Sequence, residues 1–338
     1  MRPARMSVKP SRPDLSCRWR LPTCVAVIAL AVTGCTNAPV PVSNPVAAAP
    51  VAAIAGTAPI PRPAPVQPQV SEQSRLLAIY YQRLQNDLVS RGLIRTDGGG
   101  PDTPFTDTQL AANFVQIALH DEYATTGNGL TARTTDSALR RWSGPVRFSV
   151  EFGASVPEAT QQADTAFIRN YVARLGRLTG LQTGVGTFAS NFHVLILNED
   201  ERLASADRLR QLVPGIDNSS VRYAVNLPRD QLCVVIGTFQ PDGVTYRSAV
   251  AIIRAEHPDL LRQTCVHEEL AQGLGLANDS PRARPSIFND DEEFGFLTRQ
   301  DELLLRLLYD PRLMTGMTEQ EAGPIVRQIA TELMGGPV

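Results

Sequence analysis

Lysine is almost absent from this chain of 338 residues, because Lys9 is the only one. The part of the chain that follows residue 34 therefore has no lysine, which excludes Schiff-base catalysis and a lysine-based phosphate loop there. Three other patterns are missing: the Gly-x-Ser-x-Gly turn, the glycine-rich phosphate loop and the Cys-x-x-Cys pair. These absences disfavour serine hydrolases, nucleotide enzymes and thiol oxidoreductases.

Positive charge is also scarce beyond the amino terminus. Residues 1–34 hold six of the 32 basic residues and one of the 34 acidic residues, which leaves 26 basic and 33 acidic residues. The remaining chain has a formal charge near −7 and no basic patch, so we expect neither a nucleic-acid nor a nucleotide partner. A hydrophobic content of 43% is typical of a globular protein.

Residues 1–34 have the pattern of an export signal. Residues 1–20 are basic and residues 21–34 are apolar, but this run is shorter than the roughly 20 residues of a membrane-crossing helix. The stretch Val32-Thr33-Gly34-Cys35 resembles the lipobox of bacterial lipoproteins, in which the cysteine carries lipid and becomes the first mature residue. An ordinary cleaved signal followed by a chance cysteine is the alternative.

The lipobox resemblance implies a lipid-anchored protein of the cell envelope, with membrane attachment through Cys35. Thr36 stands where inner-membrane lipoproteins of enterobacteria carry aspartate, so we expect the outer membrane, facing the periplasm. Residues 35–70 form a tether, because residues 36–70 contain nine prolines among mostly alanine and valine, a composition that favours extended chain.

Helical and strand periodicities divide the rest of the chain into two parts. Residues 71–139 form an N-terminal helical region, with helices predicted at 72–91 and from Thr106 to Tyr123. Residues 140–338 form the main domain. Its predicted elements, in order, are strand 146–152, helix 157–179, strand 192–198, helix 199–212, strands 232–239 and 245–254 joined by a turn, helix 258–274, and helices capped at Thr298 and Thr318. This order predicts an α+β fold, a twisted mixed sheet backed by helices with a mostly helical C-terminal subdomain.

Two cysteines remain after the signal and the lipidated residue are set aside. An even pair in an oxidising compartment suggests that Cys233 and Cys265 form a disulfide. Two separately buried thiols are the alternative.

The stretch that begins at Cys265 carries the most informative motif. A zincin places two histidines four residues apart on one helix face, with a glutamate beside the first. Counted from His267 this pattern fails, because Ala271 occupies the second histidine position. Counted from the next residue, the stretch resembles the metzincin motif HExxHxxGxxH. The resemblance puts Glu268, Gln272 and Asn278 at the three ligand positions, Glu269 at the catalytic glutamate and Gly275 at the turn glycine.

Two later segments extend this resemblance. Residues 285–289 look like the metzincin Met-turn, with Phe288 in the place of methionine, and residues 297–309 are similar to the capped helix that closes matrixin-type domains. The chain also resembles a family of uncharacterised proteobacterial secreted proteins, a domain of unknown function. A Glu-Glu-x-x-Gln helix and a Ser-x-Phe-Asn-Asp segment are typical of that family, and the second is here Ser286, Ile287, Phe288, Asn289 and Asp290. The resemblance implies a zincin-like, metzincin-like fold with an active-site-type helix over residues 140–310, and no activity.

The ligand positions have changed in a way that weakens zinc binding. One carboxylate and two amide oxygens are hard ligands, better matched to calcium than to zinc. We therefore expect no cofactor, and keep a weak zinc or calcium site at Glu268, Gln272 and Asn278, with help from the acidic run 290–293, as an alternative. A zinc site that joins His267 to His193 or His257 is a second alternative, although a lone histidine is more often a packing group.

These observations lead to three hypotheses about function. The first is a catalytically inactive zincin-like domain, a pseudo-metalloprotease, that binds a periplasmic protein or a cell-wall component such as peptidoglycan. The second is an atypical metal-dependent peptidase or hydrolase that uses Glu269 as its general base. The third is a purely structural role, in which the domain's own side chains fill the former substrate cleft.

Overall fold

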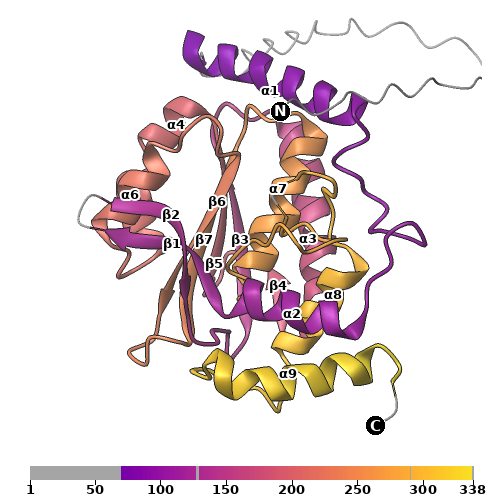
Figure 1. The fold of residues 1–338 in the computed structure, drawn as a ribbon. Helices are drawn as coiled ribbons and strands as arrows, with labels where there is room; N and C mark the ends of the chain where they lie inside the picture. The colour runs from indigo at the N-terminus through magenta and orange to yellow at the C-terminus, as the bar shows by residue number, and fades with distance from the viewer. Residues whose placement is uncertain (1–69, 127–128, 290, 337–338) are drawn as a thin grey trace, which may run out of the picture. The chain divides into compact units, whose positions relative to one another are not determined.

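The computed structural model describes residues 70–126, 129–289 and 291–336 (Figure 1). The export signal, Cys35, the tether and Asp290 lie outside the described residues. Within the described part of the chain, the helices are too short or too polar to cross a membrane.

A five-stranded mixed sheet forms the centre of the fold, in the order β4-β3-β5-β7-β6. Its strands are β3 (Val146–Phe152), β4 (Thr183–Val185), β5 (Phe192–Leu197), β6 (Cys233–Phe239) and β7 (Tyr246–Arg254). Strand β3 runs parallel to β4 and β5, β5 runs parallel to β7, and β6 is antiparallel to β7. Strands β5 and β7 read as continuous hydrophobic runs because both of their faces are covered. The predicted mixed α+β arrangement is confirmed.

Helices cover both faces of this sheet. One face packs against α3 (Glu158–Thr179), α7 (Asp259–Gln272) and α8 (Arg299–Leu308), and α2 (Asp107–Ala118) and α9 (Glu319–Leu333) complete this large core. The other face packs against α5 (Ala206–Leu212) and α6 (Asn218–Val225), which follow the short α4 (Glu199–Leu203). Because successive side chains of a strand point to opposite faces of the sheet, Val194 and Ile196 of β5 pack in the first core and Leu195 packs in the second.

The first helix, α1 (Glu72–Ser90), packs on α7 rather than forming a separate unit. Leu77 and Tyr81 on α1 share a small core with Leu261 on α7. The Ser74 hydroxyl donates a hydrogen bond to the buried Glu256 carboxylate, 2.6 Å away. Residues 70–90 therefore belong to the same compact unit as the sheet.

The structure corrects the prediction between residues 106 and 136. The capping box of Thr106 and Gln109 is present, but the helix ends at Ala118, not near Tyr123. The chain then forms the antiparallel hairpin of β1 (His120–Thr126) and β2 (Gly129–Asp136), so the predicted helical region 71–139 also contains strands. The hairpin was missed because its strands are held by pairing with each other, which the helical spacing before them does not reveal. Strand β4, helix α6 and the break between α4 and α5 were also not predicted.

Candidate functional site

Helix α7 and the edge strand β6 form the two sides of a cleft of about 680 Å³. All seven residues of β6 line it, and α7 contributes Glu268, Glu269 and Gln272. Helix α6 and the loop before it, which lie on the other face of the sheet from α7, also line the cleft. Three side chains of the predicted motif, Glu268, Glu269 and Gln272, thus lie together beside one strand.

The outer edge of β6 carries backbone groups that the sheet does not use. The Ala249 N–H of β7 donates to the Asn191 carbonyl, so Ala249 turns toward β5. In an antiparallel pair the opposite residue, Gly237, then directs its N–H and C=O away from β7, and alternation assigns the same direction to Val235 and Cys233. The Gln231 side chain donates to the Cys233 carbonyl. Within the described ranges, β7 is the strand that pairs with β6, and the outer edge faces the cleft.

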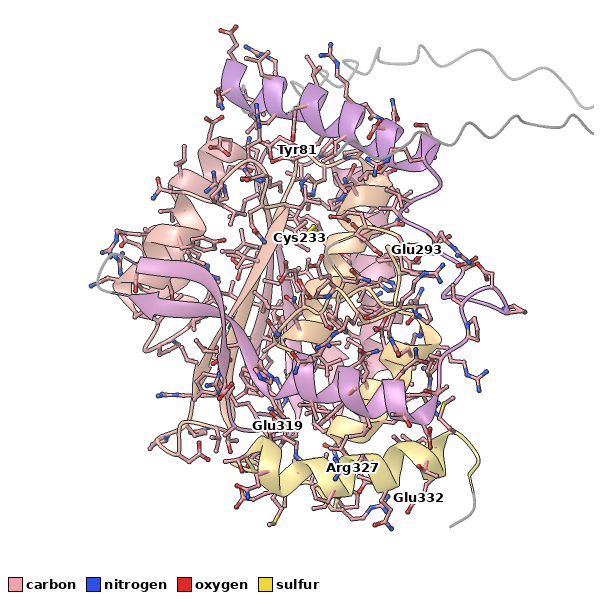
Figure 2. All side chains as sticks on the ribbon, in the orientation of Figure 1. Tyr81, Cys233, Glu293, Glu319, Arg327 and Glu332 are labelled. Carbon is pink, nitrogen blue, oxygen red and sulfur yellow. A yellow bond between two sulfur atoms is a disulfide. The ribbon has the colours of Figure 1, made fainter. Side chains whose placement is uncertain are left out.

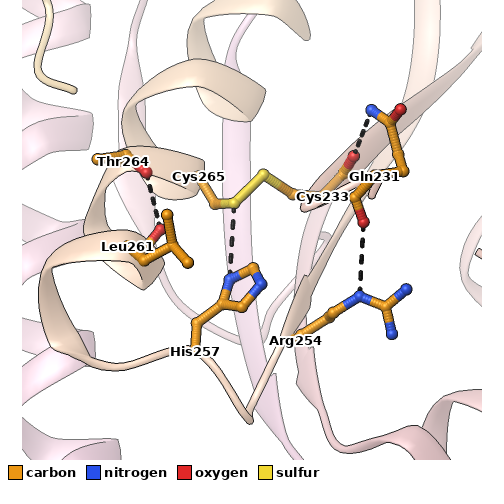
Figure 3. The surroundings of a disulfide bond; sticks show 7 residues. All are labelled: Gln231, Cys233, Arg254, His257, Leu261, Thr264 and Cys265. Atoms are coloured by element: carbon orange, nitrogen blue, oxygen red, sulfur yellow. Dashed lines mark hydrogen bonds between the residues drawn. A yellow bond between two sulfur atoms is a disulfide. The ribbon is translucent and has the colours of Figure 1, made fainter. Parts of the chain in front are cut away.

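A disulfide joins the two sides of this cleft (Figure 3). Cys233 on β6 and Cys265 on α7 are bonded, with their Cα atoms 5.9 Å apart, so the predicted disulfide is confirmed and the alternative of two separate thiols is wrong. His257 lies beside the bond, with Nδ1 3.8 Å from the Cys265 sulfur. Because Cys265 is one helical turn before Glu268 and Glu269, the bond holds the glutamate pair close to the strand.

The residues after α7 turn inward. Gly275 has φ +124°, and a Cβ there would lie 2.4 Å from the Arg140 carbonyl oxygen, so the turn requires glycine. The Asn278 side chain donates to the Gln116 carbonyl at 2.7 Å and is not among the residues that line the cleft. The neighbouring Asp279 lines it instead. The structure therefore does not bring Asn278 together with Glu268 and Gln272.

The segment that resembles a Met-turn is a buried polar network. The Ser286 hydroxyl donates to Asp301 at 2.6 Å and accepts from the Phe288 N–H at 3.0 Å. Asn289 donates through its side chain to the Ala283 carbonyl, and Phe288 is fully buried in the core. Asp301 also caps α8 by accepting from the Thr298 N–H. These residues stabilise the segment that connects α7 to α8. Asp290 lies outside the described residues.

The histidines lie in different environments. The His267 ring is stacked between Tyr171 and Phe296, with centroids 3.9 and 4.3 Å away, and its Nδ1 accepts from the Leu297 N–H. Burial lowers the pKa of His267 to about 3, so it is a neutral packing group. His193 is on β5 and bonds to Ser149, and alternation turns it toward the face that holds Leu195, away from α7. The structure does not bring His267 to His193.

One family model matches the chain. It describes a protein of unknown function, DUF2927, and it matches residues 107–328. The chain belongs to the DUF2927 family. No curated protein and no solved structure matches it. The matched residues of the DUF2927 domain begin with α2 and extend into α9, and they include the cleft, the disulfide and the glutamate pair, whereas α1 precedes them.

The described side chains at the cleft offer mainly oxygen donors to a metal ion. In the described part of the chain, the group at metal-binding distance is Cys233, Glu268 and Glu269, with ligand atoms within 4.8 Å of one another. The Cys233 sulfur is bonded to Cys265, so it cannot act as a thiolate ligand. Two carboxylates and the Gln272 amide remain, and these are hard oxygen donors without the imidazoles that zinc prefers.

Two features of the site were not predicted from the sequence. Strand β6 was predicted, but its position at the edge of the sheet depends on a crossover that places β7 between β5 and β6. Asp279 and Glu292 also line the cleft, and Glu292 has φ +58°. The available signal was the acidic character of residues 279 and 290–293, which alone is typical of any solvated loop.

Proposed function

We propose that this protein is a lipid-anchored protein of the cell envelope whose DUF2927 domain binds an extended segment of a partner protein without cleaving it. The observation that carries the proposal is that the cleft follows all seven residues of the edge strand β6. An added strand can pair with the outward N–H and C=O groups of Val235 and Gly237 and with the outward N–H of Cys233. Backbone pairing of this kind favours a protein segment over a glycan of the cell wall.

The proposal includes a zincin-like fold. Three observations support it: the antiparallel edge strand beside the Glu-Glu-x-x-Gln helix, the sharp turn at Gly275, and the buried Ser286–Phe288 turn followed by the capped helix α8. Lipid on Cys35 and a position at the outer membrane, facing the periplasm, rest on the lipobox resemblance and on the proline-rich tether.

Binding is favoured over hydrolysis by the chemistry of the cleft. A zincin hydrolase relies on a metal ion that lowers the pKa of its bound water toward neutrality. The oxygen donors here are poorly matched to zinc, and Glu269 as a base would have to activate ordinary water. We therefore assign Glu269 no catalytic step.

The charge of the cleft indicates which segments it prefers. Seven acidic residues line it: Asp121, Asp217, Asp230, Glu268, Glu269, Asp279 and Glu292. The basic residues of the lining are Arg140, which pairs with Asp121 at 2.6 Å, and Arg247. We expect the bound segment to carry lysine or arginine.

The test uses a random nonapeptide library on the purified mature chain, residues 35–338, with peptide affinities measured by fluorescence anisotropy. Val235→Pro removes an outward N–H and leaves the β7 pairing intact, so we expect binding to weaken by about tenfold or more. Thr187→Pro, in the exposed loop after β4, is the matched control. Enriched peptides that bind both variants equally well would contradict strand addition.

The same peptides separate binding from hydrolysis. We expect mass spectrometry to find them intact after incubation with the protein and added zinc. Cleavage that Glu269→Gln abolishes, in a variant with an unchanged melting temperature, would favour the peptidase alternative. Under the binding proposal, Glu269→Gln still binds the peptides.

A further inference from the structure

A second groove, of about 480 Å³, lies between α2 and α9. The two helices pack side by side, as Figure 1 shows, and this groove shares no lining residue with the cleft beside β6. The proposed function makes no use of it.

Small side chains form the floor of this groove. Ala111 and Ala112 come from α2 and Gly323 from α9. A Cβ at Gly323 would lie 3.5 Å from Nη1 of Arg327, so the guanidinium of Arg327 lies over Gly323. A ligand in the groove can therefore approach the helix backbones closely and meet this guanidinium at the same time.

The rim of the groove carries positive charge that the fold does not use. Arg282 and Arg327 both line the groove, and neither forms an ion pair with a carboxylate of the described residues. Nearby arginines differ, since Arg284 pairs with Glu293 and Arg312 pairs with Glu332. Glu319 is the acidic residue of the lining, and Figure 2 labels it with Arg327 on α9.

The amide side chains of α2 add hydrogen-bond donors. Gln109 lines the groove, and its Oε1 already accepts from the Thr106 N–H in the capping box, so its NH₂ group is the part available to a ligand. Gln116 also lines the groove. The lining has no aromatic ring on which a sugar could stack.

We propose that the α2–α9 groove binds an acidic segment of a partner protein. The argument is charge complementarity: a guanidinium matches a carboxylate in two parallel hydrogen bonds, and the groove offers two of them against one glutamate. The amide donors suit peptide carbonyls, and the small floor admits a peptide backbone. The groove is thus opposite in charge preference to the cleft beside β6.

The test measures fluorescence anisotropy of labelled hexaglutamate with the purified mature chain, residues 35–338, at low salt, beside hexalysine and inorganic phosphate. The chain after residue 34 carries a charge near −7, so hexaglutamate can bind only where a local site overcomes that repulsion. We expect Arg282→Gln/Arg327→Gln to weaken hexaglutamate binding by about tenfold or more. The matched control is Arg169→Gln, an exposed arginine of α3 that also lacks an ion pair with a described carboxylate.

A second variant, Ala112→Trp, fills the groove and keeps both arginines. Ala112 is exposed, so the fold tolerates the change, and we expect the same loss of hexaglutamate binding. Losses in both groove variants, with Arg169→Gln unchanged, support the proposal. It is overturned if the unaltered protein does not bind hexaglutamate, if Arg169→Gln is equally weakened, if Ala112→Trp binds normally, or if phosphate competes as well as the peptide.

Discussion

The two parts of the motif stretch differ in what their polar side chains do. On α7, Glu268, Glu269 and Gln272 line the cleft beside β6. After α7, Asn278 and Ser286 turn inward and form hydrogen bonds with other residues of the protein. The difference shows that one stretch of resembling sequence covers two structural roles: the residues after α7 stabilise the fold, and the polar residues of α7 line the cleft. Four experiments can break or sharpen this comparison.

The largest effect is expected in the inward part. Asp301 is fully buried and accepts from the Ser286 hydroxyl, the Ile287 N–H and the Thr298 N–H. Asp301→Ala leaves these buried donors without a partner, so we expect a loss of about 5 kcal/mol in the free energy of unfolding by urea. Arg306→Ala, at an exposed position of the same helix, is the control and changes little. A loss below about 1 kcal/mol for Asp301→Ala would mean that the network is not structural.

The disulfide joins β6 to α7, the two sides of the cleft, and its loss is expected to have the second largest effect. It closes a sequence separation of 32 residues, for which chain entropy predicts about 4 kcal/mol of stability. We expect Cys233→Ala/Cys265→Ala to lower the free energy of unfolding by that amount and to speed amide exchange in β6. A reductant should destabilise the unaltered protein and leave the variant unchanged. Equal sensitivity of both proteins to reductant contradicts this assignment.

A pH effect is expected from His267, which packs on the side of α7 away from the cleft. Its folded-state pKa of about 3 lies below the ordinary value of 6.5, because burial disfavours the charged ring. The stability it contributes is complete above pH 6.5 and is lost as the pH falls toward 3, by about 2 kcal/mol at pH 5.

The measurement is urea unfolding at pH 7 and pH 5. His267→Asn keeps an acceptor for the Leu297 N–H but does not titrate, so we expect it to be less stable overall and to lack this pH-dependent loss. The same pH-dependent loss in both proteins would assign the effect to another group.

The smallest effect is expected in the cleft part. Glu268 is half-buried and lines the cleft, and Glu268→Gln keeps the shape of the side chain, so it should lower the free energy of unfolding by about 1 kcal/mol or less. We also expect mass spectrometry of the purified chain to find no stoichiometric zinc. Stoichiometric zinc that disappears in Glu268→Ala/Gln272→Ala would contradict the inactive zincin-like proposal, and zinc that persists there would point to the histidines.

Elements with a strong local pattern could be predicted closely. Strand 146–152 matches β3, and the capping boxes at Thr298 and Thr318 begin α8 and α9 as expected. These signals lie within a few residues, where hydrogen bonding and side-chain alternation act. The hairpin of β1 and β2 could not be predicted from local signals, because each of its strands is held by pairing with the other. The direction of the Asn278 side chain could not be predicted either, because its partner, Gln116, lies 162 residues away in the sequence.

The amino-acid sequence by itself determined the absence of lysine after residue 34, the mixed α+β order of elements and a helix that carries Glu268, Glu269 and Gln272. Only the tertiary structure decided that β6 is an edge strand, that Cys233 is bonded to Cys265, and that Asn278 faces inward. It also decided that Arg282 and Arg327 share a groove. The reason is physical: periodicity and capping act between near neighbours, whereas a cleft exists only where distant segments pack and leave backbone and charge exposed.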